Sequence, residues 1–393
     1  MPTPITIVGG GFAGLTAAIT AAEAGARVTL YEAHRTLGGR ARTAEGPYRT
    51  NEGPHALYHR GPHWSWLTQR GLLGPMAAVP PRESARFRFH LDGELRRTPP
   101  LGILRLARRR PEQAPVDADF ATWSQRLTGG PAGRAAAHFA AVALFHHDPG
   151  SLSARFVQER LRRATALPPE AHYPRGGWGG VIDRMAARAR DLGVRVETSA
   201  RVDALPDRDG PVVVATSLDG ARRLLGDPAL TWPSGRTVLL DLALRSHRGD
   251  PFVISDLDAP GWLERFTAQD PSLAPAGQTL LQGQFPIAPQ QSKADGVAHA
   301  ERLLDKGFPG WRERTLWRRE AVANGRTGAV DLPGTTWRDR PAIDRGDGVL
   351  LAGDQVSAPG VLTEVSFTSA ISAASLALRA ARVTPSRTPA PCP

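Results

Sequence analysis

A glycine-rich turn between a short apolar run and a helical segment constrains this chain more than any other feature. Residues 5–8 read Ile-Thr-Ile-Val, which is typical of a buried parallel strand. Gly9, Gly11 and Gly14 follow with the G-x-G-x-x-G spacing, and residues 15–24 predict a helix. Such glycines let the backbone approach a diphosphate, and the helix directs its positive end at it. The segment therefore predicts a dinucleotide site in a parallel α/β sheet.

The residues after this turn support the same interpretation. Residues 27–31 predict a second strand, and Glu32 lies at its end, about 20 residues beyond the glycines, where a carboxylate accepts ribose hydroxyls. A signal peptide is the alternative for residues 5–22. We reject it because no basic region precedes this stretch and three consecutive glycines interrupt it.

Three separated blocks of the sequence, residues 5–58, 173–216 and 348–381, carry further glycine motifs. The motifs are Gly38-Gly39-Arg40 and Glu52-Gly53-Pro54-His55 in the first block, Gly176-Gly177-Trp178-Gly179-Gly180 in the second, and Gly353-Asp354 with Pro359-Gly360 in the third. Together the blocks resemble the superfamily of flavin-dependent amine oxidases and phytoene desaturases. The resemblance implies that they build one domain that binds FAD, and the lack of a cysteine near the third block predicts that the binding is non-covalent.

The fold class that follows is α/β, with a Rossmann-like FAD-binding domain of parallel sheet and helices. A second, α+β substrate domain would contain an antiparallel sheet and a helical subdomain. The chain then divides into three parts. The FAD-binding domain comprises residues 1–58, 173–232 and 340–382, and the substrate-binding domain comprises residues 59–172 and 233–339. Residues 383–393 are expected to form a disordered tail.

The resemblance also implies roles for single residues. Arg40 would lie near the diphosphate or the flavin, the Val202 backbone near the adenine, and Asp354 near the ribityl phosphate. The peptide N–H groups of residues 361–363 would face the pyrimidine edge of the flavin. The predicted cofactor-binding residues are Gly9, Gly11, Phe12, Ala13, Gly14, Glu32, Ala33, Gly39, Arg40, Gly53, Pro54, His55, Val202, Gly353, Asp354, Gly360, Val361, Leu362 and Thr363.

Periodicity and turn signals predict the remaining elements. A hairpin is expected over residues 87–97 with its turn at Asp92-Gly93. Helices are expected at residues 101–110, 117–127, 131–146, 153–164, 176–192, 218–225 (with Ser217 as N-cap) and 293–306. Strands are expected at residues 194–196, 201–205, 212–215, 237–244, 252–254, 279–285, 315–318 and 349–352.

Three residues are candidates for acid–base catalysis. His55 follows a motif expected beside the flavin, and an imidazole titrates near neutrality. Alternatively, His55 has a structural role and donates a hydrogen bond to a backbone carbonyl. Glu364 lies at the start of the last helix, close to the expected flavin edge, and is the second candidate. Alternatively, it is a first-turn acid that interacts favourably with the helix dipole. Tyr173 either faces the pocket or anchors its loop.

The sequence contains a single dinucleotide fingerprint, so we expect electrons to leave to oxygen, to a quinone, or to a nicotinamide that visits the substrate pocket. The lysine and paired aromatic residues of amine oxidases have no convincing counterpart, because Lys293 and Lys306 fall in a helical segment and only Trp337 precedes the Gly-Asp turn closely. We therefore expect desaturase-like removal of hydride from a hydrophobic, natural-product-like substrate. The alternatives are an amine oxidase, an FAD-binding isomerase or cyclase without net redox change, and an accessory protein without chemistry.

The composition of the chain limits which binding partners and which cellular compartment we expect. The formal net charge is +11 and is carried almost entirely by arginine, which we attribute to coding bias rather than to nucleic-acid binding. The basic run at residues 105–110 predicts a solvated helix face, or a peripheral contact with anionic lipid. Cys392 is the only cysteine, so no disulfide, cysteine-ligated metal or cysteine-linked flavin is expected. We predict no metal site, no membrane-spanning helix and a cytoplasmic location.

Overall fold

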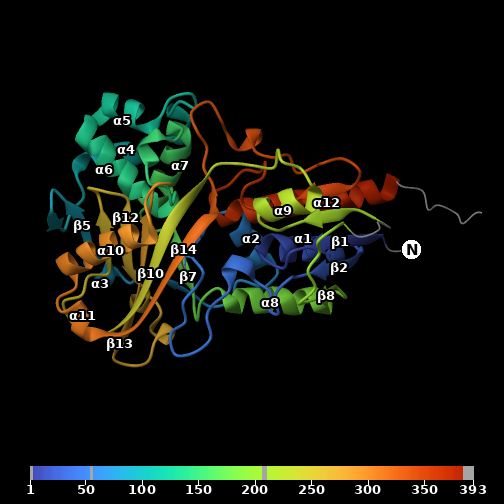
Figure 1. Ribbon diagram of the computed structural model, residues 1–393, viewed down its shortest axis with the longest axis horizontal. Coiled ribbons are helices and arrows are strands. Elements are labelled where there is room, and N and C mark those ends of the chain that lie inside the picture. The colour runs from blue at the N-terminus through green and yellow to red at the C-terminus, as the bar shows by residue number, and fades with distance from the viewer. Residues whose placement is uncertain (1–2, 54–55, 206–209, 384–393) are drawn as a thin grey trace, which may run out of the picture.

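The N-terminal strand lies at the centre of a parallel sheet (Figure 1). The computed structural model describes residues 3–53, 56–205 and 210–383. The sheet has the order β15-β9-β1-β2-β8, and every neighbouring pair is parallel. Its strands are β1 (Pro4–Val8), β2 (Arg27–Tyr31), β8 (Arg195–Glu197), β9 (Val212–Val214) and β15 (Val349–Leu351).

Small residues allow helices to pack closely on this sheet. Helix α1 (Phe12–Glu23) contacts β1, α8 (Gly179–Asp191) and α12 (Thr363–Val383). Part of the buried face of α12 is made of Ala370, Ala373, Ala374 and Ala377, at the i, i+3, i+4, i+7 spacing of one helix face. Because these side chains are small, α12 and α1 pack against each other along their length (Figure 1).

A second sheet of seven strands lies beside the first and has the order β14-β10-β13-β12-β11-β5-β6. Neighbouring strands are antiparallel except for the parallel pair β5 and β11. The strands are β5 (Phe87–Leu91), β6 (Glu94–Arg96), β10 (Ser234–Arg245), β11 (Val253–Asp256), β12 (Gly261–Arg265), β13 (Gln278–Pro286) and β14 (Thr315–Ala329). A small antiparallel sheet joins β3 (Leu57–Tyr58), β7 (Ala171–Pro174) and β4 (Met76–Ala78).

Helices cover the second sheet. Helix α10 (Lys293–Gly307) buries Leu303 and Leu304 in a cluster with residues of β10 and β13. A helical subdomain at the upper left of Figure 1 has its own core around Phe120 and Phe139. Its helices are α4 (Leu101–Ala107), α5 (Phe120–Thr128), α6 (Gly130–Ala140) and α7 (Ala154–Ala164). The remaining helices are α2 (Pro62–Gln69), α3 (Pro81–Ser84), α9 (Leu218–Leu225) and α11 (Trp311–Arg314).

The predicted fold class is confirmed, with the parallel β5–β11 pair as the departure from an antiparallel second sheet. The Ser217 cap is also confirmed, because its Oγ accepts a hydrogen bond from the Gly220 N–H at 3.1 Å. The strand predicted at residues 201–205 is wrong: these residues, which the structure describes, form no strand. Arg201, Val202 and Asp203 instead line a cavity. The predicted disordered tail lies outside the described residues from residue 384 onward.

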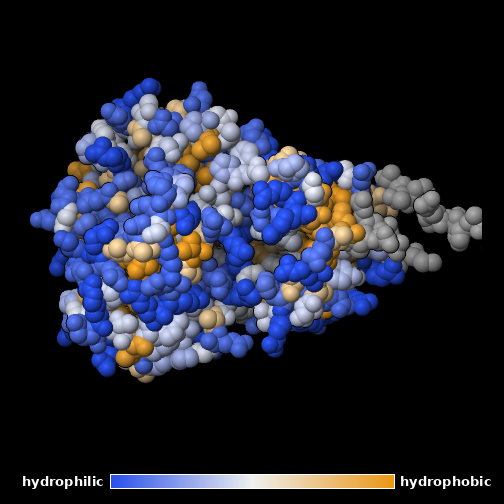
Figure 2. Space-filling model, viewed as in Figure 1, coloured by the Kyte–Doolittle hydropathy of each residue, from blue (hydrophilic) through white to orange (hydrophobic). Residues whose placement is uncertain are grey.

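The length and polarity of the helices, and the polarity of the surface, determine whether the described residues could span a membrane. Within residues 3–53, 56–205 and 210–383, every helix is too short or too polar to cross a bilayer. Figure 2 shows a largely hydrophilic face, with hydrophobic residues gathered at the end of the molecule where α12 and β1 lie and in smaller patches elsewhere.

Close packing at Gly14 generates a first prediction. A Cβ at this position would lie 1.8 Å from the Gly9 carbonyl oxygen, which is backbone and cannot turn aside. We expect Gly14→Ala to lower the free energy of unfolding by about 3 kcal/mol, as overpacking does. Urea denaturation measures this loss. The matched control is Gly130→Ala in the first turn of α6, where the added Cβ meets only Arg134 Nη1, at 3.5 Å. An equal effect of both substitutions would contradict the packing argument.

Candidate functional site

A cavity of about 760 Å³ runs along the carboxyl edge of the parallel sheet and continues to the second sheet. One end is lined by the glycine turn after β1 and by residues beyond β2 and β9. The other end is lined by Leu57 and Tyr58 of β3, by Leu239 of β10 and by residues 321–323 of β14. Its size is that of sites which enclose a cofactor or a small molecule. The carboxyl edge is also where ligands bind in open α/β sheets.

Most residues predicted from the sequence to hold a cofactor line this cavity. They are Gly9, Gly11, Phe12, Ala13, Glu32, Ala33, Gly39, Arg40, Gly53, Val202, Gly353, Asp354, Val361, Leu362 and Thr363. Gly14 and Gly360 lie behind the lining, where an added Cβ would meet the Gly9 carbonyl oxygen and the Glu364 Cβ, respectively. Pro54 and His55 lie outside the described residues.

Glu32 closes the glycine turn from the side of β2. Its Oε2 accepts a hydrogen bond from the Gly10 N–H and its Oε1 one from the His34 N–H, both at 2.8 Å. A carboxylate has about four lone-pair positions, so two remain for further donors. The side chain is buried but lines the cavity, as a group that receives two vicinal hydroxyls must. These features fit the ribose of a dinucleotide.

Arg40 and Asp354 join the first and third blocks across the cavity. Arg40 donates from Nη1 to Asp354 Oδ2 at 2.6 Å and from Nη2 to Asp354 Oδ1 at 2.8 Å. Its Nη1 also donates to the Arg326 carbonyl oxygen, at 2.7 Å, in β14. The two-pronged pairing fixes the plane of the guanidinium, and the Arg40 side chain, which is 42% exposed, lines the cavity. A guanidinium held in this way suits a diphosphate.

The N-terminus of α12 also faces the cavity. The Val361 N–H donates to Glu364 Oε2 at 2.9 Å, so this amide is engaged within the chain. Leu362 has a φ of 53°, a left-handed conformation that is unusual for a leucine. Leu362 and Thr363 line the cavity at the positive end of the helix. This end is suited to partial negative charge on a bound ring.

A charged network lies directly behind this helix terminus. Glu364 Oε1 accepts from Arg163 Nη2 at 2.9 Å, and Arg163 also pairs with Glu170. Glu364 is therefore buried, paired and absent from the cavity lining. Its contacts suit a residue that fixes the start of α12.

His63 of α2 joins this network from the cavity side. Its side chain is 1% exposed, and its Nδ1 lies 3.9 Å from Glu364 Oε1. Within the described residues neither ring nitrogen has a hydrogen-bond partner. Burial lowers the pKa of His63 to about 4, against the opposing effect of Glu364. The imidazole is therefore neutral at neutral pH and lines the cavity as an uncharged ring.

The structure places Tyr173 away from the cavity. It lies in β7, its side chain is buried, and its hydroxyl donates to Glu264 Oε1 at 2.7 Å. Trp262 Nε1 and Gln269 Nε2 donate to the same carboxylate at 3.0 and 2.9 Å. This group is fully bonded, and its geometry suits an anchor for the small sheet. Tyr58 lines the cavity near β10 and β14 instead, and burial raises its pKa to about 12.

Sequence reasoning did not find His63 or Tyr58. The segment Leu57-Tyr-His-Arg-Gly-Pro-His63 has no periodicity and no spacing of a known motif. The proline at position 62 begins α2, which places His63 in its first turn. That helix-start signal could have located the helix, but only the packing of α2 against α12 brings His63 beside Glu364.

Comparisons with known proteins agree with this geometry. A family model described as an NAD(P)-binding Rossmann-like domain matches residues 7–72. No protein with a curated description matches the sequence significantly. The chain is similar in structure to an oxidoreductase from Methanosarcina mazei, with a TM-score of 0.74, 18% identity, and coverage of 94% of this chain and 99% of that one.

Two amine oxidases are similar to a comparable degree. Cyclohexylamine oxidase from Brevibacterium oxydans has a TM-score of 0.71 and 18% identity, with coverage of 96% of this chain and 99% of that one. A putrescine oxidase variant redesigned in its cofactor binding has a TM-score of 0.73 and 14% identity, with the same coverage. The chain thus has the fold of these oxidoreductases, as the resemblance to the flavin-dependent amine oxidase and phytoene desaturase superfamily predicts. The fold and the Rossmann match point to a flavin or dinucleotide cofactor.

The low pKa of His63 predicts how stability depends on pH. In the unfolded chain this histidine titrates near 6.5, so between pH 6.5 and about 4 the unfolded state binds more protons than the folded state. Stability is therefore lost as the pH falls through this window, by about 3 kcal/mol from this group. Urea denaturation from pH 7.5 to 4 should show a correspondingly smaller loss for His63→Gln. His147→Gln is the control, and an unchanged slope in His63→Gln would refute the assignment.

Proposed function

We propose that this protein is an FAD-dependent oxidoreductase that binds its cofactor without a covalent bond. The observation that carries the proposal is the single cavity that connects the glycine turn, at one end, with an apolar wall of the second sheet, at the other. A bound FAD would extend along it, with the adenosine beside Glu32 and the flavin beside the N-terminus of α12. The fold shared with amine oxidases supports this orientation.

Separate groups of the chain would hold separate parts of the cofactor. The backbone of Gly9 and Gly11 and the first turn of α1 would receive the diphosphate, with Arg40 as a nearby cation. Glu32 would accept the ribose hydroxyls. Gly353 and Asp354 would lie beside the ribityl phosphate. Bound FAD supplies a ring that accepts hydride, and the protein's tasks are to orient the substrate and exclude water.

The flavin end of the cavity favours a hydrophobic substrate. Leu57, Phe145, Leu239 and residues 321–323 contribute mostly apolar side chains, and the nearby His63 is uncharged. Neither Lys293 nor Lys306 lines the cavity. These features support desaturase-like removal of hydride from an apolar, natural-product-like molecule over oxidation of an amine. We propose oxygen or a quinone as the electron acceptor.

Glu364 and Tyr173 then act through other groups rather than on the substrate. Glu364 would position the N-terminus of α12 through the Val361 N–H, and Tyr173 would hold β7 in place through Glu264. His55 remains a candidate for proton transfer next to the flavin. We further propose a cytoplasmic location, with peripheral contact of the basic segment 105–110 at anionic lipid as an accompanying hypothesis.

The absorption spectrum of the purified protein tests the cofactor, and anaerobic mixing with candidate substrates tests the reaction. We expect a yellow protein whose flavin absorbance is lost in proportion to added hydrophobic substrate. An isomerase or cyclase would convert substrate without this loss. A colourless protein that FAD cannot reconstitute would exclude the proposal.

The role of Glu32 gives a quantitative test. Glu32→Gln keeps the size of the side chain and an acceptor for the Gly10 N–H, but it removes the negative charge that strengthens hydrogen bonds from the ribose. We expect FAD affinity to fall about tenfold, as the loss of a charged hydrogen bond predicts. Titration of the apoprotein by flavin fluorescence measures it. Glu45→Gln, an exposed position outside the cavity, should leave the affinity unchanged.

A further inference from the structure

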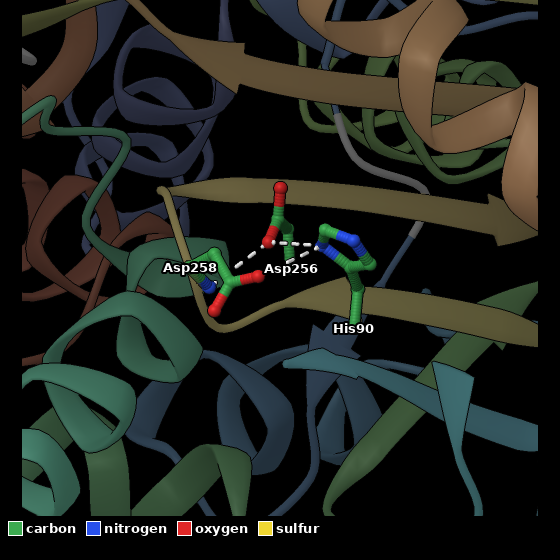
Figure 3. Close-up of side chains that lie close together, drawn as sticks. All are labelled: His90, Asp256 and Asp258. Carbon is green, nitrogen blue, oxygen red and sulfur yellow. Dashed lines mark hydrogen bonds and ion pairs between the residues drawn. The ribbon is translucent and has the colours of Figure 1, made fainter. Parts of the chain in front are cut away.

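A cluster of histidine and aspartate side chains lies in the second sheet, outside the cavity described above (Figure 3). His90 comes from β5, Asp256 ends β11, and Asp258 lies in the turn that leads to β12. Figure 3 shows the three side chains pointing toward one another. His299 of α10 approaches Asp256 from the other side. The proposed redox function uses none of these residues.

The separations between the ligating atoms suit a small cation. His90 Nδ1 lies 2.9 Å from Asp256 Oδ1 and 3.6 Å from Asp258 Oδ2, and the three ligand atoms all lie within 4.8 Å of one another. Tetrahedral zinc, with bonds of about 2.0–2.2 Å, holds neighbouring ligand atoms about 3.4 Å apart. An ion between the three atoms would therefore require only small side-chain movements.

The surrounding contacts orient the carboxylates toward this point. Asp258 accepts from the Asp92 N–H at 2.9 Å and from the Gly93 N–H at 3.1 Å, in the turn between β5 and β6. His299 Nε2 lies 2.7 Å from Asp256 Oδ2, while Oδ1 lies 2.9 Å from His90 Nδ1 and accepts from the Asp258 N–H at 3.0 Å. Outer contacts of this kind fix the ligands of protein metal sites and contribute to their affinity.

The charge and access of the cluster also favour a divalent cation. Asp256 and Asp258 supply two negative charges, while the nearby ammonium of Lys306 is bonded to the Gly93 carbonyl oxygen at 3.0 Å. A proton on His90 Nδ1 makes a good hydrogen bond to only one of the two carboxylates at a time. A metal cation can contact the imidazole nitrogen and both carboxylates at once. The Asp258 side chain is 36% exposed, so the cluster opens to solvent.

We propose that His90 Nδ1, Asp256 Oδ1 and Asp258 Oδ2 form a binding site for a divalent transition-metal cation such as Zn²⁺, with His299 as a positioning residue. The mixed nitrogen and oxygen ligands match zinc better than calcium or magnesium, which prefer oxygen alone. Binding displaces the proton from His90 Nδ1, and water completes the coordination. The ion would tie the β5–β6 hairpin, the turn after β11 and, through His299, helix α10 together.

Calorimetric titration of the chelator-treated full chain with Zn²⁺ tests the site. We expect one equivalent to bind, and Asp258→Asn and His90→Gln each to weaken binding at least about tenfold. Asp258→Asn keeps a carbonyl oxygen for the Asp92 N–H and loses only the acceptor for the Gly93 N–H, in a partly exposed turn, so this variant should fold. His299→Gln should weaken binding but keep the stoichiometry. Zn²⁺ should also raise the unfolding temperature of the wild type and not that of Asp258→Asn.

The control is His147→Gln, because the ring centroids of His146 and His147 lie 4.5 Å apart and form a histidine pair outside the proposed site. It should bind Zn²⁺ as the wild type does. Absence of saturable binding, or equal affinity in wild type, Asp258→Asn and His90→Gln, would overturn the proposal. Flavin content of each variant is measured in parallel, and it should not change, so this result is independent of the proposed redox function.

Discussion

The close approach of α1 to the parallel sheet is the contact on which the rest of the structure depends. Gly14 lies against the Gly9 carbonyl, so α1 begins at the carboxyl edge of β1, and its first residues, Phe12 and Ala13, line the cavity. The Phe12 ring then packs at 5.5 Å from Trp178 and 5.4 Å from Phe367, which belong to the second and third sequence blocks. One helix start therefore joins segments far apart in the chain.

The cavity is a consequence of how the two sheets meet. The parallel sheet supplies an edge of backbone amides and the carboxylate of Glu32, whereas β10 and β14 supply a mostly apolar wall. Behind the start of α12, Glu364 and Glu170 are paired with Arg163 away from the cavity lining. Polar groups therefore lie at the end suited to phosphates, and neutral ones where a hydrophobic substrate would react.

Features with a local cause could be predicted from the sequence. The strand, glycine turn and helix at residues 5–24, the hairpin turn at Asp92-Gly93 and the Ser217 cap each depend on neighbouring residues, and all are present. Strand β12 was missed because Gly-Trp-Leu-Glu-Arg has no clear alternation, and it is a strand only because β11 and β13 pair with its two edges. Pairings of this kind depend on residues remote in sequence. The division into a cofactor domain and a substrate domain remains a prediction.

The sequence by itself determined the α/β class, the glycine turn and most of the residues that line one end of the cavity, because a dinucleotide fold encodes its turn in a short contiguous motif. Only the tertiary structure decided that His63 lies buried and neutral beside Glu364, that Tyr58 rather than Tyr173 reaches the cavity, and that residues 90, 256 and 258 meet. These outcomes follow from packing between elements, and burial and charge pairing have no signature in the local sequence.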